Sequence, residues 1–183
     1  VSFITARYMK DNKVAGQVDF DKKKDKGSTV LWGSEINTEK IDLSTKLGYV
    51  FPDLPFQSAG LQVAYNYHKQ DSYFGLNLYD IKQNSLYSNL VFNSIINNTL
   101  HKFTTGISFT LDQYTEQVFV PGIDGNFNRT DNALGAFYEY TYDNTTDFSV
   151  VAGMRVDYHN RMGLFATPRL HLRYNPWENG VLR

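Results

Sequence analysis

The stretch that decides the fold runs from residue 41 to residue 51 and reads IDLSTKLGYVF. Its apolar side chains recur mostly at every second position, and polar or small side chains mostly occupy the positions between them. A period of two places successive side chains on opposite faces of a β-strand. The stretch therefore predicts a strand with an apolar face of Ile41, Leu43, Leu47, Tyr49 and Phe51 and a polar face of Asp42, Ser44, Lys46 and Gly48.

The same alternation recurs in six further segments, and no helical periodicity extends beyond two turns. Thr45, Ser88 and Thr105 are mild exceptions on the apolar face, and no charged residue falls on it. The apolar positions of the six segments are Leu61, Val63, Tyr65 and Tyr67; Leu86, Leu90 and Phe92; Phe103, Ile107, Phe109 and Leu111; Leu134, Ala136, Tyr138, Tyr140 and Tyr142; Phe148, Val150, Ala152, Met154, Val156 and Tyr158; and Leu170, Leu172 and Tyr174.

The composition excludes several classes of protein. The chain has 183 residues, a formal net charge of -1, 20% charged and 42% hydrophobic residues, which excludes a disordered tail and a strongly basic nucleic-acid arm. It contains no cysteine, so disulfides and thiolate metal sites are not available. The four histidines show no metal-ligand spacing and no Ser/His/Asp set can be assembled, so we expect no enzyme, metal or cofactor.

Strand length and connections favour a membrane wall. About 11 residues, rising ~3.3 Å each and tilted near 45°, cross roughly 25 Å, the height of an outer-membrane apolar band. Short connections are predicted at residues 52–56, 95–99, 143–146 and 175–180, and longer loops at 10–39, 69–83, 113–131 and 159–164. Aromatic residues lie near both ends of the strands, as at bilayer interfaces. Long loops on one side are typical of the extracellular side of outer-membrane barrels.

We therefore expect an all-β fold. Residues 1–183 would form one partial outer-membrane β-barrel, an antiparallel up-and-down transmembrane segment of about eight strands from a larger barrel. Two alternatives stay open. A soluble β-sandwich also alternates, with its apolar face inward. Eight strands could also close a small self-contained outer-membrane barrel, an adhesin or an enzyme, whose interior would then have to hold many charged side chains.

Three segments near the C-terminal end resemble one family. Residues 135–140 read GAFYEY, residues 151–160 read VAGMRVDYHN, and residues 167–176 read TPRLHLRYNP. This succession resembles the barrel of TonB-dependent outer-membrane receptors, in which a strand ending GxRxDxH is commonly followed by a loop and a strand of the form PRLxLxYxP. The resemblance covers about residues 130–183. The rest of the chain agrees with it in architecture only.

The resemblance implies a function and a set of partners. It implies a parent barrel of about 22 strands in the outer membrane of a Gram-negative bacterium, surrounding an N-terminal plug domain that this chain lacks. Such a receptor takes up a scarce nutrient, such as an iron chelate (siderophore) or cobalamin. Energy comes from a periplasmic TonB-type coupling protein that grips the plug. The remaining expected partners are outer-membrane lipid and lipopolysaccharide, and no nucleic acid is expected.

Residues 113–131 form the candidate ligand-binding loop, through Tyr114, Phe119, Phe127 and Arg129. Aromatic rings and an arginine above a lumen suit a large anionic ligand that carries rings. The alternative is a structural loop packed on its neighbours. Residues 124–130 also alternate oxygen-bearing side chains as a calcium loop does, but Arg129 and Gly135 stand where an EF-hand needs glycine and glutamate.

Further charged residues have two readings each. Five residues are predicted to face the lumen, where they contact the plug or a passing anion, or pair with charges on the wall: Arg155, Asp157, Arg169, His171 and Arg173. The basic run at residues 22–26 would meet lipopolysaccharide phosphates or form a solvated hairpin tip.

Overall fold

The computed structural model describes residues 1–177 and 180–182 as one antiparallel sheet whose strands follow chain order from one edge to the other. The predicted all-β, antiparallel, up-and-down arrangement is confirmed. A helix that could span a membrane is absent from these residues. The strands are β1 (Ser2–Gly16), β2 (Gly33–Val50), β3 (Ser58–Phe74), β4 (Asn77–Ile96), β5 (Asn98–Val120), β6 (Ile123–Asp143), β7 (Phe148–His159), β8 (Gly163–Trp177) and β9 (Gly180–Leu182).

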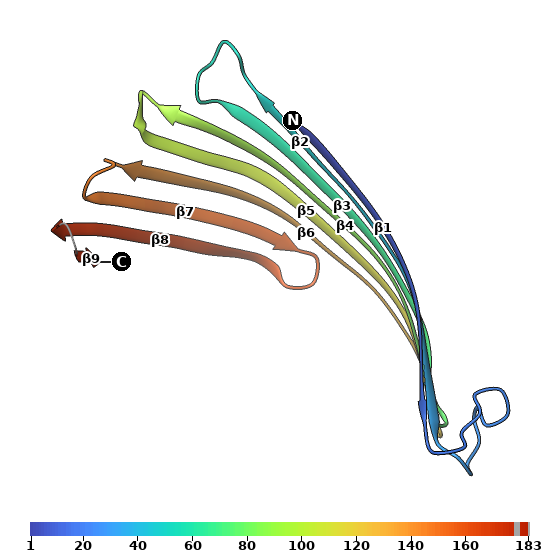
Figure 1. The fold of residues 1–183 in the computed structure, drawn as a ribbon. Coiled ribbons are helices and arrows are strands. Elements are labelled where there is room, and N and C mark those ends of the chain that lie inside the picture. Colours follow the sequence, from blue (N-terminus) through green and yellow to red (C-terminus); the bar gives the residue numbers. More distant parts are fainter. Residues whose placement is uncertain (178–179, 183) are drawn as a thin grey trace.

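The sheet is a single curved layer that is not closed (Figure 1). Within the described residues β1 pairs with β2 alone and β9 with β8 alone, so the two outermost strands lie at free edges. The layer has almost no interior. Its accessible surface is 12650 Å², whereas a compact monomer of this mass would expose about 9,000 Å². Stability therefore has to come from something that covers this layer.

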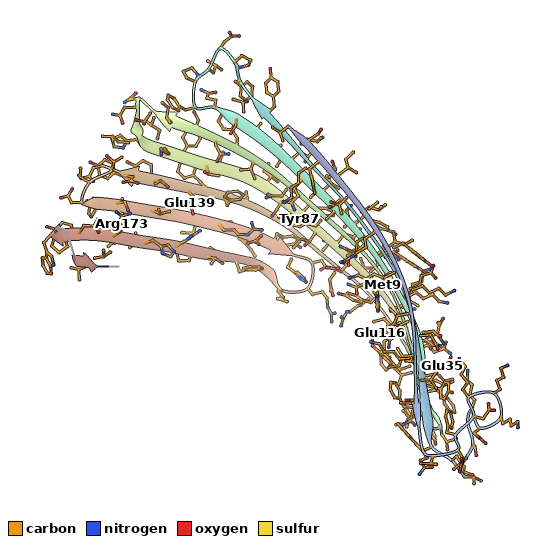
Figure 2. All side chains as sticks on the ribbon, in the orientation of Figure 1. Met9, Glu35, Tyr87, Glu116, Glu139 and Arg173 are labelled. Carbon is orange, nitrogen blue, oxygen red and sulfur yellow. The ribbon has the colours of Figure 1, made fainter. Side chains whose placement is uncertain are left out.

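The strand register carries each face unbroken from strand to strand. One row of partners runs from Leu47 through Leu61, Leu90 and Ile107 to Ala136. Every member was expected on an apolar face, so the separate alternating patterns coincide on one side of the sheet. We call this side the apolar face and the opposite side the polar face. Figure 2 shows side chains projecting from both.

Two predicted long loops are wrong. At residues 69–83 strand β3 continues to Phe74 and β4 begins at Asn77, and at residues 113–131 β5 continues to Val120 and β6 begins at Ile123. Each pair closes through two residues that include a glycine at positive φ, Gly75 at 61° and Gly122 at 91°. Both faces of these extensions carry polar side chains, so hydrophobic alternation gives no sign of them, although the backbone pairing is regular.

The extensions distinguish the two ends of the sheet. We call the end with the turns at residues 75–76 and 121–122 the tip end, and the end with the connections 51–57 and 144–147 the turn end. At the tip end β1 and β2 also continue, so the predicted loop at residues 10–39 shrinks to residues 17–32. The alternating stretches at residues 14–20 and 29–36 predict a separate hairpin within that loop, and this prediction is wrong, because residues 14–16 and 33–36 are the ends of β1 and β2. The predicted turn at residues 175–180 lies partly outside the described residues.

Residues 17–32, the cap segment, fold over the apolar face at the tip end. The Phe20 ring covers Gly16 and Gly33, where any Cβ would collide with it. Lys26 Nζ lies 4.9 Å from the centre of the Tyr73 ring. Tyr73 is consequently only 3% exposed, the one buried apolar side chain among the described residues. Part of the predicted basic run thus packs on the sheet.

Glu35 makes the attachment of the cap segment dependent on pH. Asn12 Nδ2 donates to Glu35 Oε1 (2.7 Å), and Lys22 Nζ lies 3.1 Å from the same oxygen. Both partners, Asn12 first, lower the pKa of Glu35 from its ordinary value of 4.5. A lowered pKa in the folded state stabilises the contact above pH 4.5 and loses that stabilisation as the pH falls through the lowered pKa.

We therefore expect the cap segment to loosen in acid, and Glu35→Gln to loosen it at neutral pH. Backbone amide exchange at residues 17–32 measures this. In the wild type, protection relative to an unstructured peptide at the same pH should fall below pH 4.5, whereas the variant should show low protection without that pH dependence. Equal protection of the cap segment in both proteins at pH 7 would contradict the role given to Glu35.

Candidate functional site

The apolar face carries a continuous apolar belt next to the turn end. Along β5 its outward positions read Phe103, Thr105, Ile107, Phe109 and Leu111, and then change to Gln113, Thr115 and Gln117. The neighbouring strands change in the same way. We define the belt by Ile4, Ala6 and Tyr8 on β1; Ile41, Leu43, Leu47 and Tyr49 on β2; Leu61, Val63, Tyr65 and Tyr67 on β3; Leu86, Leu90 and Phe92 on β4; Phe103, Thr105, Ile107, Phe109 and Leu111 on β5; Leu134, Ala136, Tyr138, Tyr140 and Tyr142 on β6; Phe148, Val150, Ala152, Met154, Val156 and Tyr158 on β7; and Leu164, Ala166, Leu170, Leu172 and Tyr174 on β8.

The tip-side edge of the belt crosses the rows of paired residues obliquely. The last apolar residue is Ile41 on β2 and Leu134 on β6. The row of Leu134 meets β2 at Thr45, through Phe109, Ser88 and Val63. The edge therefore shifts by four residues, from 41 to 45, over the four strand spacings from β2 to β6.

The turn-side edge shifts in the same sense. The row of Tyr49 meets β8 at Pro168, yet the belt on β8 continues to Tyr174, six residues further over six strand spacings. One residue of ~3.3 Å for each spacing of ~4.8 Å inclines the strands by roughly 35° to the normal of the belt. Over the same six spacings the tip-side edge shifts four residues, because Leu164 on β8 lies in the row of Leu134, which corresponds to roughly 25°. Both edges are therefore oblique in the same sense, and the belt spans nine residues on β2 and eleven on β8.

Aromatic rings line the turn-side edge and contact one another across strands. Tyr49 and Phe51 meet edge to face with centroids 5.1 Å apart. Phe103 follows, 6.0 Å from Phe92 and 5.7 Å from Tyr138. These spacings are those of favourable aromatic pairs. The edge of the belt is therefore a connected aromatic border.

On the polar face, Arg155, Asp157 and Ser108 form a compact cluster over three strands. Arg155 Nε donates to Asp157 Oδ2 (2.7 Å), and Arg155 Nη2 donates to Ser108 Oγ (2.6 Å). Gly135 on β6 stands between Ser108 and Asp157 in the register, and any Cβ there would collide with the Asp157 carboxylate. The absence of a side chain at Gly135 therefore lets Arg155 reach across β6. Sequence reasoning did not assign this role to Gly135.

The other residues predicted for the lumen share this polar face. Arg169 Nη1 donates to Glu139 Oε2 (3.1 Å) from two strands away, and both side chains are partly exposed. Arg173 Nε donates to Asn175 Oδ1 (3.4 Å). His171 stands between these two arginines on the same face of β8. In Figure 2 Glu139 and Arg173 lie in the part of the sheet nearest the turn end.

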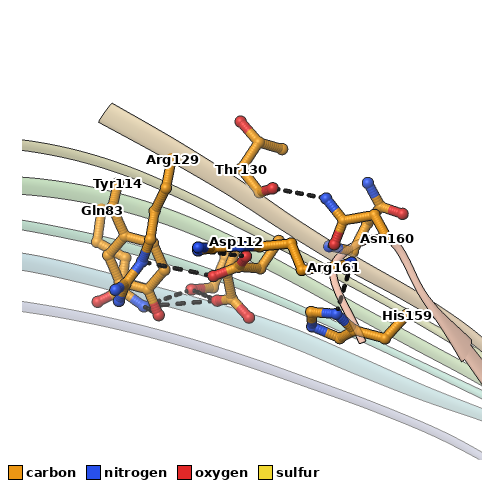
Figure 3. Close-up of polar contacts among 11 residues, drawn as sticks. Gln83, Asp112, Tyr114, Arg129, Thr130, His159, Asn160 and Arg161 are labelled. Atoms are coloured by element: carbon orange, nitrogen blue, oxygen red, sulfur yellow. Dashed lines mark hydrogen bonds and ion pairs between the residues drawn. The ribbon is translucent and has the colours of Figure 1, made fainter. Parts of the chain in front are cut away.

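Nearer the tip end the polar face carries a second group, the upper cluster: Gln83, Ser85, Asp112, Tyr114, Arg129, Asp131 and Arg161. Figure 3 labels Gln83, Asp112, Tyr114, Arg129 and Arg161 of this cluster. The Arg129 guanidinium stacks 4.2 Å from the centre of the Tyr114 ring, and Gln83 Nε2 donates to the Tyr114 hydroxyl (3.1 Å). Arg129 Nε lies 3.4 Å from Asp131 Oδ2, and Arg161 Nη1 lies 3.5 Å from Asp131 Oδ1. Asp131 is thus held between two arginines.

Asp112 and Asp131 are directly opposite in the register of β5 and β6. Two carboxylates in this position repel each other. Ser85 Oγ donates to Asp112 Oδ1 (2.5 Å), and the arginines neutralise Asp131. The short β7–β8 connection brings Arg161 to this place because Asn160 Nδ2 donates to the Thr130 carbonyl oxygen (2.8 Å). Sequence reasoning missed this contact, since residues 130 and 161 are far apart in the chain.

The structure separates the four predicted ligand residues. They lie on the paired strands β5 and β6, so their assignment to a loop is wrong. Tyr114 and Arg129 are cross-strand partners in the upper cluster, and Phe127 lies on the same polar face. Phe119 points to the apolar face. The arrangement thus brings together the Tyr114 ring and the Arg129 cation, and Phe127 lies two residues nearer the tip on the same face.

No calcium loop is formed at residues 124–130, because they are strand and their alternate side chains point to opposite faces. Among the residues described, no group of three histidine or acidic side chains could hold a metal ion.

Comparison with known proteins adds no assignment. No family model matches the chain, and no curated protein is significantly similar to it.

Proposed function

We propose that the chain is part of the barrel wall of a TonB-dependent receptor in the outer membrane of a Gram-negative bacterium. Its role is transport rather than catalysis. The apolar belt faces lipid, and the polar face lines a wide aqueous lumen that a plug domain occupies. The imported nutrient belongs to the scarce compounds that such receptors take up, such as an iron chelate or cobalamin. The turn end faces the periplasm and the tip end faces outward.

The oblique belt carries this proposal. A flat bilayer cuts inclined strands along two parallel lines, and outer-membrane strands tilt by about 35–45°. The turn-side edge gives an inclination of roughly 35°, at the lower end of that range, and the tip-side edge gives roughly 25° in the same sense. The aromatic border lies at one of these lines, where rings with polar tips are favoured. Most large side chains of the belt are exposed, Ile107 at 54% and Leu170 at 65%, and a lipid phase would cover them.

A soluble β-sandwich accounts less well for the same features. It needs a second layer over the apolar face, and the described residues supply only the cap segment at the tip end. A small closed barrel would join β1 to the C-terminal strands, yet both lie at free edges. Ion pairs such as Arg169 with Glu139 stay partly exposed on the polar face, as befits a watery lumen. Transport itself is supported by the resemblance of residues 130–183.

Fractionation and growth test the proposal. The protein that contains this chain should sediment with the outer membrane. A strain lacking it should lose growth on at least one iron chelate or on cobalamin as the sole source, and a protonophore should abolish uptake in the wild type. A folded protein in the soluble fraction would contradict the membrane role. Normal growth of the deletion strain on all these sources would contradict the transport role.

The upper cluster predicts where an anionic ligand first binds. Arg129→Gln should lower the apparent affinity for the imported ligand roughly tenfold or more, because a charge-assisted hydrogen bond is worth about 1.5–3 kcal/mol. Arg169→Gln, lower on the polar face, is the matched control and should leave affinity within about twofold. Binding to intact cells measures both, with receptor abundance checked by immunoblot. Equal affinities in the two variants would remove the upper cluster from ligand binding.

A further inference from the structure

Two lysines stand directly opposite each other just beyond the belt. Lys69 on β3 and Lys82 on β4 are register partners on the apolar face, two residues nearer the tip than Tyr67. Lys10 on β1 lies in the same row, separated from Lys69 by Glu39. Like charges directly opposite in a sheet are destabilising unless something neutralises them. The row therefore carries two adjacent positive charges near the height where the belt ends, with Glu39 on the other side of Lys69. Two residues nearer the tip, the same face carries the register partners Asp71 and Asp80.

The two lysines differ in their neighbours. Lys69 Nζ lies 2.7 Å from Asp71 Oδ2, so its charge is partly neutralised. Lys82 takes part in no ion pair within residues 1–177 and 180–182, and its Nζ lies 5.9 Å from the centre of the Tyr67 ring. Lys82 thus offers a positive charge near the tip-side border of the belt, beside the Tyr67 ring.

A shallow polar hollow of about 400 Å³ adjoins Lys82 on the same face. It is lined by Lys82, Asn84, Gln113, Thr115, Asn128 and Thr130, together with Tyr114 and Arg129 of the upper cluster. On the apolar face, Lys82, Thr115 and Asn128 share one row across β4, β5 and β6, and Asn84, Gln113 and Thr130 share another row two residues away. Amide and hydroxyl groups both donate and accept hydrogen bonds, which suits a sugar, while the adjacent lysines suit a phosphate. The belt continues from Leu86 and Leu111 directly below the hollow.

We propose that this place binds the headgroup of a phosphorylated glycolipid of the outer leaflet. Its phosphate lies against Lys82 and Lys69, its sugar occupies the hollow, and its acyl chains run down the belt. This inference rests on the proposed function, because it requires the belt to lie in a membrane. It also moves the headgroup contact away from the basic run at residues 22–26. Lys22 and Lys26 of that run contact Glu35 and Tyr73, which lie six residues beyond Ile41 and Tyr67 and thus roughly 20 Å further along the strands.

Lipid binding to the protein extracted from the outer membrane tests the site. The protein would be delipidated in dodecyl maltoside and titrated with diphosphoryl lipid A, and the bound lipid counted by native mass spectrometry. Lys69→Gln with Lys82→Gln should weaken binding roughly 20-fold or more, since each lysine at an anionic membrane surface contributes roughly fivefold. Lys40→Gln with Lys46→Gln removes two lysines from the polar face and should leave binding unchanged.

Two further probes identify the chemistry. Dephosphorylated lipid A should bind the wild type as weakly as lipid A binds the Lys69/Lys82 variant. Phosphatidylglycerol, an anionic lipid without this sugar, should bind more weakly than lipid A and should be less sensitive to the substitutions. Equal losses for the two lipids would overturn the glycolipid assignment.

The outcomes separate this inference from the proposed function. If both double variants sediment with the outer membrane and bind lipid A as the wild type does, the headgroup site is overturned and the membrane wall stands. If the wild-type protein is folded and monodisperse without detergent or lipid, both are overturned.

Discussion

Replacing Ile107 by arginine is expected to lower the free energy of unfolding by about 2–4 kcal/mol, the cost of a cation at the lipid-facing middle of an outer-membrane barrel. Ile107 lies near the centre of the belt on β5 and is 54% exposed. Burial within the protein therefore does not predict a large effect. The cost arises only if lipid surrounds the side chain.

Gln117→Arg is the matched control for Ile107→Arg. Gln117 lies on the same strand and the same face, ten residues nearer the tip and beyond the belt. Its substitution should change stability by less than about 1 kcal/mol, the range for barrel residues outside the hydrocarbon. Urea unfolding of each variant in phospholipid vesicles gives the two values. Similar small effects at both positions would contradict the assignment of the belt to lipid.

Asp157→Ala is expected to destabilise the protein by about 2 kcal/mol, because a hydrogen-bonded charge that loses its partner costs roughly 1–3 kcal/mol. Asp157 is 6% exposed and accepts two hydrogen bonds from Arg155. The figure lies below that for a fully buried pair, because the Arg155 side chain is 41% exposed and water partly replaces the lost carboxylate.

Glu139→Ala is the comparison on the same face. The partner of Glu139, Arg169, has a side chain that is 61% exposed, and pairs of this kind contribute about 0–1 kcal/mol. Unfolding under the same conditions should show a clear loss for Asp157→Ala and a small one for Glu139→Ala. A larger effect at Glu139 would mean that the polar face is dry there, contrary to a watery lumen.

The two faces of the strands were predictable from the sequence because alternate side chains point to opposite faces, and only one of the two faces is apolar. In the segment of residues 41–51, Ile41 and Leu43 need only a period of two to share a face. The register then matches them with Tyr67 and Tyr65, which had been placed on an apolar face independently. The oblique edges of the belt were not predictable, because they depend on which residues pair between strands.

The strand extensions were missed because both of their faces meet polar surroundings. Between Gln113 and Phe119 the side chains on each face are mixed, so hydrophobicity has no period there. A signal was nevertheless present. Pro121 and Gly122 form a turn dipeptide at the middle of the predicted loop, a signal for a tight turn between two strands of equal length.

The candidate ligand residues show the limit of reasoning from composition. Tyr114 and Arg129 were chosen for their chemistry, and the register makes them stacking partners. Phe119 was chosen on the same ground, but it lies on the other face. Because residues 113–131 were treated as a loop, no strand faces were assigned to them. The sequence reasoning therefore could not place Phe119 on a different face from Tyr114 and Arg129.

The most direct test of the lipid-facing belt uses the absence of cysteine from the chain. Single cysteines along β5, at alternate positions from Phe103 to Gln117 and at Ser108 and Thr110, would carry nitroxide labels in the membrane-embedded protein. Collisions with oxygen, which concentrates in hydrocarbon, should dominate at positions 107, 109 and 111. Collisions with a water-soluble nickel complex should dominate at 108, 110, 115 and 117. Equal access of the nickel complex to positions 107 and 117 would contradict the lipid-facing belt.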